Sequence, residues 1–71
     1  MPVVKVIELV GQSKIGWEDA VRNAVKAASK TVRNISGVEV LNWTATVDPN
    51  NGDLTEYRAD VNVAFAVDGT D

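Results

Sequence analysis

The sequence predicts a small α+β fold in which a three-stranded, mainly antiparallel sheet wraps on one helix. Three observations predict it: a β-branched run near the N-terminus, one stripe of apolar residues at helical spacing, and two later runs joined by an Asn-Gly turn. The 71 residues suffice for one domain, and we take residues 1–71 as that domain. The predicted order is strand, helix, strand, strand (β-α-β-β).

Residues 3–10 predict the first strand because most of them are β-branched. One side would carry apolar residues together with Glu8, and the other would carry apolar residues together with Lys5. These apolar residues are Val4, Val6 and Val10 on the first side, and Val3, Ile7 and Leu9 on the second. Since both faces are mostly apolar, we expect a central or covered strand, ended by residues 11–13.

A helix is predicted from Trp17 onward because apolar residues recur there at spacings of three and four. Gly16 stands at the N-cap position, acidic residues follow in the first turn, and basic residues load the second half, as the helix dipole favours. We expect the helix to end near Asn34, with Gly37 as the turn residue beyond it. The predicted stripe consists of Trp17, Val21, Ala24, Val25, Ala28, Val32 and Ile35.

Two further strands are predicted on either side of a hairpin turn at residues 48–53, which contains Asn-Gly. In the second strand, residues 38–48, the apolar residues change from even to odd positions. A bulge or bend near Val40 and Leu41 would explain the change, and so would an oligomer that buries both faces at one end. The third strand alternates from Tyr57 to Val67.

Composition excludes several classes of protein. The net charge of −3 disfavours nucleic acid as a partner, and the longest apolar run, Val63 to Val67, is too short to span a membrane. The N-terminus lacks the pattern of a secretory signal, so we expect a cytoplasmic protein. The absence of cysteine and histidine excludes zinc fingers, redox dithiols and Ser-His or Cys-His catalysis, and we expect no enzyme.

The chain is also small for a stable monomer. Below roughly 70–80 residues, apolar burial barely balances conformational entropy, and small domains need a disulfide, a metal or self-association. Disulfides are excluded by the composition, as is a metal held by histidine or thiolate. We therefore expect an oligomer of identical chains.

Several stretches, in this order, resemble the dodecins, small proteins that assemble as hollow homododecamers and bind flavins. The matching stretches are Lys5–Ser13, Trp17–Ala20, Lys30–Asn34, Val38–Val40 and Tyr57–Phe65. The resemblance covers nearly the whole chain. It implies a hollow homododecamer, with a flavin such as FMN or riboflavin as the ligand.

Two positions depart from the flavin-binding pattern that the resemblance implies. In flavin-binding dodecins a tryptophan two residues before the Glu-Val of the second strand stacks on the isoalloxazine ring, and a glutamine after the tyrosine of the third strand bonds its edge. Gly37 and Arg58 occupy these positions here. A stacked aromatic side chain buries about 150–250 Å², worth on the order of 4–6 kcal/mol, so its loss should weaken flavin binding.

Trp43 and Arg58 are candidate ligand-binding residues, together with Gly37. Trp43 could stack on a planar molecule, and Arg58 could contact a phosphate or carboxylate. Alternatively, Trp43 fills a subunit interface and Arg58 pairs with Glu39 or Glu56. Trp17 is expected to pack in the core.

The turn at residues 48–53 concentrates oxygen-bearing side chains, the ligands that calcium prefers. They are Asp48, Asn50, Asn51 and Asp53. Their spacing is not that of an EF-hand, and an ordinary hairpin turn explains them equally well. No metal ligand is assigned, although the resemblance includes calcium-binding dodecins.

Two hypotheses for the function follow. The first is a non-catalytic binding or storage protein that holds a flavin or another small planar molecule between subunits. The second is a structural or calcium-binding shell that has lost flavin binding through Gly37 and Arg58.

Overall fold

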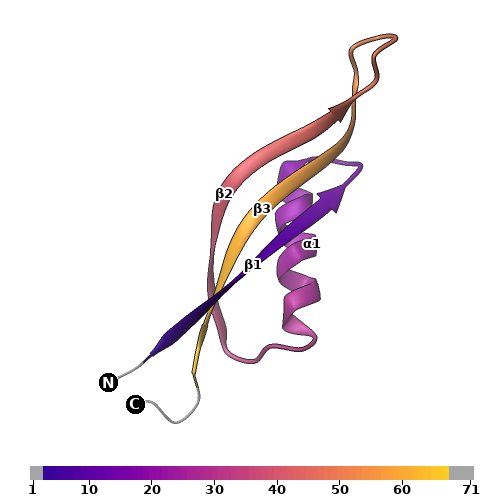
Figure 1. Ribbon diagram of the computed structural model, residues 1–71. Coiled ribbons are helices and arrows are strands. Elements are labelled where there is room, and N and C mark those ends of the chain that lie inside the picture. Colours follow the sequence, from indigo (N-terminus) through magenta and orange to yellow (C-terminus); the bar gives the residue numbers. More distant parts are fainter. Residues whose placement is uncertain (1–2, 68–71) are drawn as a thin grey trace.

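The computed structural model describes residues 3–67 and confirms the predicted order of elements (Figure 1). The elements are β1 (Val4–Ser13), α1 (Trp17–Ser29), β2 (Ile35–Val47) and β3 (Leu54–Ala66). The strands form one antiparallel sheet in the order β1-β3-β2. The helix lies along one face of this sheet, and the opposite face has no helix over it (Figure 1).

The strand β1 continues through residues 11–13, which were expected to end it. Gly11 pairs with Ala59 and Ser13 pairs with Tyr57. A Cβ atom at Gly11 would lie 1.9 Å from the carbonyl oxygen of Ala20, so the glycine lets the helix backbone approach the strand. Gly11 is therefore a packing residue and not a turn residue.

The central strand is β3, so the expectation of a central N-terminal strand was wrong, while the alternative that a neighbour covers this strand stays a prediction. β1 forms one edge of the sheet. Val4, Val6 and Val10 are 55%, 54% and 58% exposed because they lie on the face that the helix does not cover. The face of β1 that carries these three valines therefore remains open in the subunit.

The helix ends at Ser29, five residues before the expected end near Asn34. The backbone N–H groups of Thr31 and Val32 both donate to the carbonyl of Ala28, which tightens the last turn. Asn34, with a φ of 65°, makes the turn that was expected at Gly37. Val32 thus follows the helix and Ile35 begins β2, although both continue the helical spacing.

The helix starts at Trp17, with Gly16 at the predicted N-cap position. Because glycine has no side chain to cap the helix, Ser13 orders the approach to it. Its Oγ accepts a hydrogen bond from the Ile15 N–H at 2.9 Å and donates one to Asp19 at 2.6 Å.

The core is made of small residues. The residues on the buried side of α1 are alanines, of which Ala20 was missing from the predicted stripe. They pack against the central residues of β3, where Val61 and Val63 are the largest fully buried side chains. The buried apolar residues are Ala20, Ala24, Ala28, Ala59, Val61 and Val63.

The predicted bulge and hairpin are both present. The register between β2 and β3 shifts between Val40 and Asn42, so that Val40 and Trp43 lie on the same face despite their odd spacing. The turn after β2 is closed by a hydrogen bond from the Asp48 N–H to the Asp53 carbonyl at 2.8 Å.

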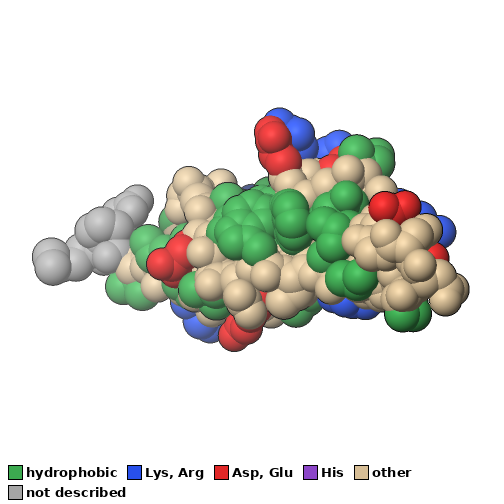
Figure 2. Space-filling model, turned by 90° about the horizontal axis from the view of Figure 1, so that it is seen from above, with side chains coloured by type: hydrophobic (Ala, Val, Ile, Leu, Met, Phe, Trp, Pro, Cys, Tyr) green, Lys and Arg blue, Asp and Glu red, His purple; other side chains and the backbone are tan. Residues whose placement is uncertain are grey.

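The subunit is elongated, with extents of 54 × 20 × 13 Å. Its radius of gyration is 14.8 Å, against about 11 Å for a compact domain of this length. Its accessible surface is 4976 Å², against roughly 4300 Å² for a typical monomer of this mass. Hydrophobic side chains form broad areas on the face seen in Figure 2.

Within the described residues there is no helix with the length and apolarity needed to cross a membrane.

Candidate ligand-binding site

An aromatic cluster joins the start of α1 to the middle of β2 and β3. The ring of Trp17 lies 6.1 Å from Trp43 and 4.9 Å from Tyr57, edge to face in both pairs. The Nε1 of Trp17 donates a hydrogen bond of 2.8 Å to the Thr44 carbonyl. Trp17 packs in this cluster and is half-buried.

Trp43 is the exposed member of the cluster. The bulge in β2 brings Trp43 opposite Ala59, on the same side of the sheet as the helix. Its side chain nevertheless remains 50% exposed, although its ring contacts Trp17, the first residue of the helix. A half-exposed indole held edge-on by a second indole offers a flat apolar surface for stacking.

Arg58 lies on the opposite face of the sheet from Trp43. In register it stands between Gln12 of β1 and Thr44 of β2. Its guanidinium forms an ion pair of 2.8 Å with Glu56, one of the two partners considered from the sequence. Both side chains are about one-third exposed, so the pair competes only weakly with a ligand.

Gly37 pairs with Ala64, which is six residues from Arg58 along β3. At about 3.3 Å per residue this separation is roughly 20 Å. A Cβ atom at Gly37 would meet no described atom within 4 Å. A single subunit therefore does not bring Gly37, Trp43 and Arg58 together, and a site made from all three needs more than one copy of the chain.

The oxygen atoms of the turn at residues 48–53 are used to build the turn. The Asp48 carboxylate accepts a hydrogen bond from the Asn50 N–H, and the Asn51 side chain accepts one from the Asp53 N–H, both at 2.9 Å. In residues 3–67 no group of three acidic or histidine side chains could hold a metal ion. The hairpin interpretation agrees with this arrangement, and calcium binding by Asp48, Asn50 and Asp53 stays a prediction.

A polar band crosses the open face of the sheet, and the sequence analysis did not identify it. Glu8 of β1 contacts Asp60 of β3, and Asn62 donates a hydrogen bond of 3.4 Å to Glu39 of β2. The only signal in the sequence is Glu8 itself, a carboxylate between two valines of the same face. Its partner could not be found without the register of the strands.

The carboxyl groups of Glu8 and Asp60 in this band interact. A side-chain hydrogen bond with Asp60 raises the pKa of Glu8 above its usual value, and the negative charge of Asp60 raises it further. One oxygen of Asp60, Oδ1, is buried and has no hydrogen-bond partner among residues 3–67. The band is thus a place where protonation changes the charge of the open face.

Comparisons with known proteins agree with this architecture. The profile of the Dodecin family matches residues 3–68, nearly the whole chain. The chain belongs to the dodecin family. This confirms the resemblance noted in the sequence.

Dodecin relatives cover similar lengths. The calcium dodecin of Mycobacterium tuberculosis is 37% identical over 65 residues, which are 92% of this chain and 89% of that protein. The dodecin of Thermus thermophilus is 34% identical over 68 residues, 96% of each chain.

Solved dodecin structures superimpose closely. The tt0972 protein from Thermus thermophilus has a TM-score of 0.90 at 33% identity, over 99% of this chain and 100% of that one. The calcium-chelating dodecin from Mycobacterium tuberculosis, described with a novel calcium-binding site, has a TM-score of 0.77 at 32% identity, over 97% and 96%. The chain therefore shares its fold with both of these dodecins. This likeness of fold does not identify its ligand.

Proposed function

We propose that the chain is a non-catalytic binding or storage protein of the cytoplasm. It assembles as a hollow homododecamer and holds a small planar molecule, with a flavin as the first candidate, in cavities between subunits. The observation that carries the proposal is the half-exposed Trp43, held edge-on by Trp17 in a chain of the dodecin family. An indole can stack on any planar aromatic ring, so this surface does not by itself select a particular ligand.

The shape of the subunit supports self-association. Its open sheet face carries Val4, Val6 and Val10, each more than half exposed, in an elongated subunit with a core of small residues. Covering such side chains removes apolar surface from water at about 25 cal/mol per Å². Other copies of the chain provide the matching apolar surfaces.

Light scattering coupled to size exclusion tests the assembly. We expect a mass near twelve times the 7.6 kDa subunit. A well-folded, monodisperse single subunit at micromolar concentration would contradict the proposal.

Titration with riboflavin and FMN tests the ligand. We expect tryptophan fluorescence to be quenched, with Trp43→Leu weakening binding and Trp43→Phe retaining a ring to stack on. Trp17 remains as the reporter in both variants, which makes them matched controls. A purified protein that is colourless, and whose fluorescence does not change when either flavin is added, would refute flavin binding.

A calcium-binding shell is the second candidate, favoured by the 37% identity to a calcium dodecin. The oxygen ligands would come from Asp48, Asn50 and Asp53, in a chain with a net charge of −3. We expect calcium to raise the melting temperature and a chelator to lower it, and Asp48→Asn with Asp53→Asn to abolish the effect. A melting temperature indifferent to both reagents would refute calcium binding.

A further inference from the structure

A cavity of about 320 Å³ lies between the end of α1 and the neighbouring ends of β1 and β3. It is on the helix side of the sheet, where Lys5 and Phe65 are paired across the strands. Phe65 and Ala59, the partner of Trp43, are six residues apart along β3, or roughly 20 Å. The cavity is thus separate from the candidate residues Gly37, Trp43 and Arg58.

The segment after the helix forms one wall of this cavity. The early end of α1 releases residues 30–34, and the positive φ of Asn34 turns them back toward the sheet. The carbonyl of Asn34 accepts a hydrogen bond of 3.0 Å from the Ala66 N–H, which fixes this wall to the end of β3. A backbone hydrogen bond therefore holds one wall of the cavity in place.

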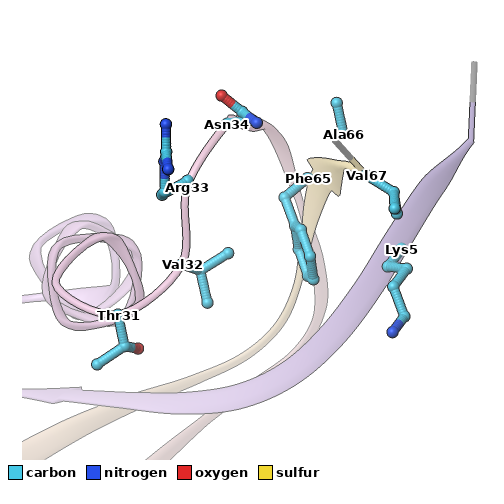
Figure 3. Close-up of a pocket in the computed structure, with 8 residues that line it drawn as sticks. All are labelled: Lys5, Thr31, Val32, Arg33, Asn34, Phe65, Ala66 and Val67. Carbon is cyan, nitrogen blue, oxygen red and sulfur yellow. The ribbon is translucent and has the colours of Figure 1, made fainter. Parts of the chain in front are cut away.

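The lining combines an aromatic ring with two cations. Figure 3 shows the Phe65 ring between the side chains of Val32 and Lys5, with Arg33 at the rim, extended away from the ring. No acidic residue of the described chain lines the cavity, and within residues 3–67 neither Lys5 nor Arg33 forms an ion pair. Among the described residues, one cation (Lys5) thus lies beside the aromatic ring and a second (Arg33) stands at the rim, in a chain of net charge −3.

We propose that this cavity binds a small organic anion with an aromatic body, such as an aryl phosphate or aryl carboxylate. The ring would pack against Phe65 and Val32, and the anionic group would accept hydrogen bonds from Lys5 and Arg33. Arg33 is exposed and extends away from the ring, so its side chain would have to turn toward the cavity to reach a bound anion. The volume is at the lower end of the ~300–1,000 Å³ range of ligand sites, so it suits one ring.

Saturation-transfer NMR with phenyl phosphate tests the proposal on the assembled protein. We expect the double variant Lys5→Gln, Arg33→Gln to bind phenyl phosphate about tenfold more weakly, because it lacks the charged donors for the anionic group. The matched control Lys14→Gln, Lys26→Gln removes the same charge from exposed sites and should leave the affinity unchanged. Equal affinity in both double variants would overturn the proposal.

Two simpler probes separate the parts of the ligand. Inorganic phosphate and benzyl alcohol should each bind at least about tenfold more weakly than phenyl phosphate, because each lacks half of the contacts. Inorganic phosphate binding equally well would refute the aromatic part, and no transfer from millimolar phenyl phosphate would refute the site. Trp43→Leu should not change phenyl phosphate binding, so the outcome is independent of the proposed flavin site.

Discussion

Trp17 meets Trp43 edge to face, with ring centroids 6.1 Å apart, at the point where the helix begins beside β2. The same Trp17 side chain donates a hydrogen bond to the carbonyl of Thr44, the residue after Trp43. One helical residue therefore fixes both the backbone and the ring orientation of its neighbours in β2. Packing against Trp17 therefore positions the Trp43 ring.

Trp17→Phe should lower the free energy of unfolding by about 1 kcal/mol or somewhat more. The phenyl ring keeps most of the aromatic packing but leaves the Thr44 carbonyl without its indole donor. Urea denaturation at fixed protein concentration measures the change. Trp43→Phe is the control, because no hydrogen bond from its indole is found in residues 3–67, and a larger loss there would contradict this assignment.

Gly11→Ala should destabilise the fold strongly, by about 3 kcal/mol or enough to prevent folding. The added Cβ would lie 1.9 Å from the Ala20 carbonyl oxygen, so the helix must move away from the sheet. Thermal or urea unfolding of the purified variant measures the loss.

Gly37→Ala is the matched control for that substitution. Its Cβ would meet no described atom within 4 Å, and we expect a change below about 0.5 kcal/mol. Equal destabilisation by the two substitutions would mean that backbone freedom, and not close packing at Gly11, is the reason for the glycine.

The elements of the fold could be predicted from the sequence because each has a distinct periodicity. The bulge near Val40 was also predictable, since a change of apolar phase requires an extra residue. The end of the helix was not, because Val32 and Ile35 continue the helical spacing while belonging to a connecting segment and a strand. Ala20 was missed although it is fully buried and stands at the same spacing of four as Ala24 and Ala28, which the predicted stripe includes.

The arrangement of the candidate site could not be predicted from the sequence. Whether Trp43 and Arg58 share a face depends on the register after the bulge, and the structure places them on opposite faces. The contact between Glu8 and Asp60 likewise depends on the pairing of β1 with β3, because the two residues are 52 positions apart in the sequence. Periodicity gives the face of a residue within its own strand, but not its neighbour on the next strand.

Stability should fall as the pH rises from about 4.5, the usual pKa of a glutamate, toward neutrality. Asp60 raises the pKa of Glu8 in the folded state, so within this window the folded chain binds more protons than the unfolded chain. The free energy of unfolding then decreases with pH until Glu8 is ionised in both states. Urea midpoints measured across this window at constant protein concentration test the slope.

Glu8→Gln should flatten that slope and raise stability at neutral pH, because the amide removes the repulsion with Asp60. Glu39→Gln is the control: it makes the same change of charge on the same face and keeps an oxygen to accept the hydrogen bond from Asn62. If Glu39→Gln flattened the profile as much as Glu8→Gln, the general charge of the open face would explain the pH dependence.

The double variant Gly37→Trp, Arg58→Gln should gain flavin affinity. Gly37 has room for a side chain and no positive φ, so a tryptophan there meets no steric barrier within the subunit. A stacked indole is worth on the order of 4–6 kcal/mol, and half of that corresponds to about a hundredfold tighter binding. Arg58→Gln also breaks the ion pair with Glu56, in which both side chains are about one-third exposed. Such a pair is worth at most about 1 kcal/mol, so the fold should survive. FMN and riboflavin titrations of the double variant, both single variants and the original chain measure the gain; a double variant that binds no tighter than the original would show that other residues decide the ligand.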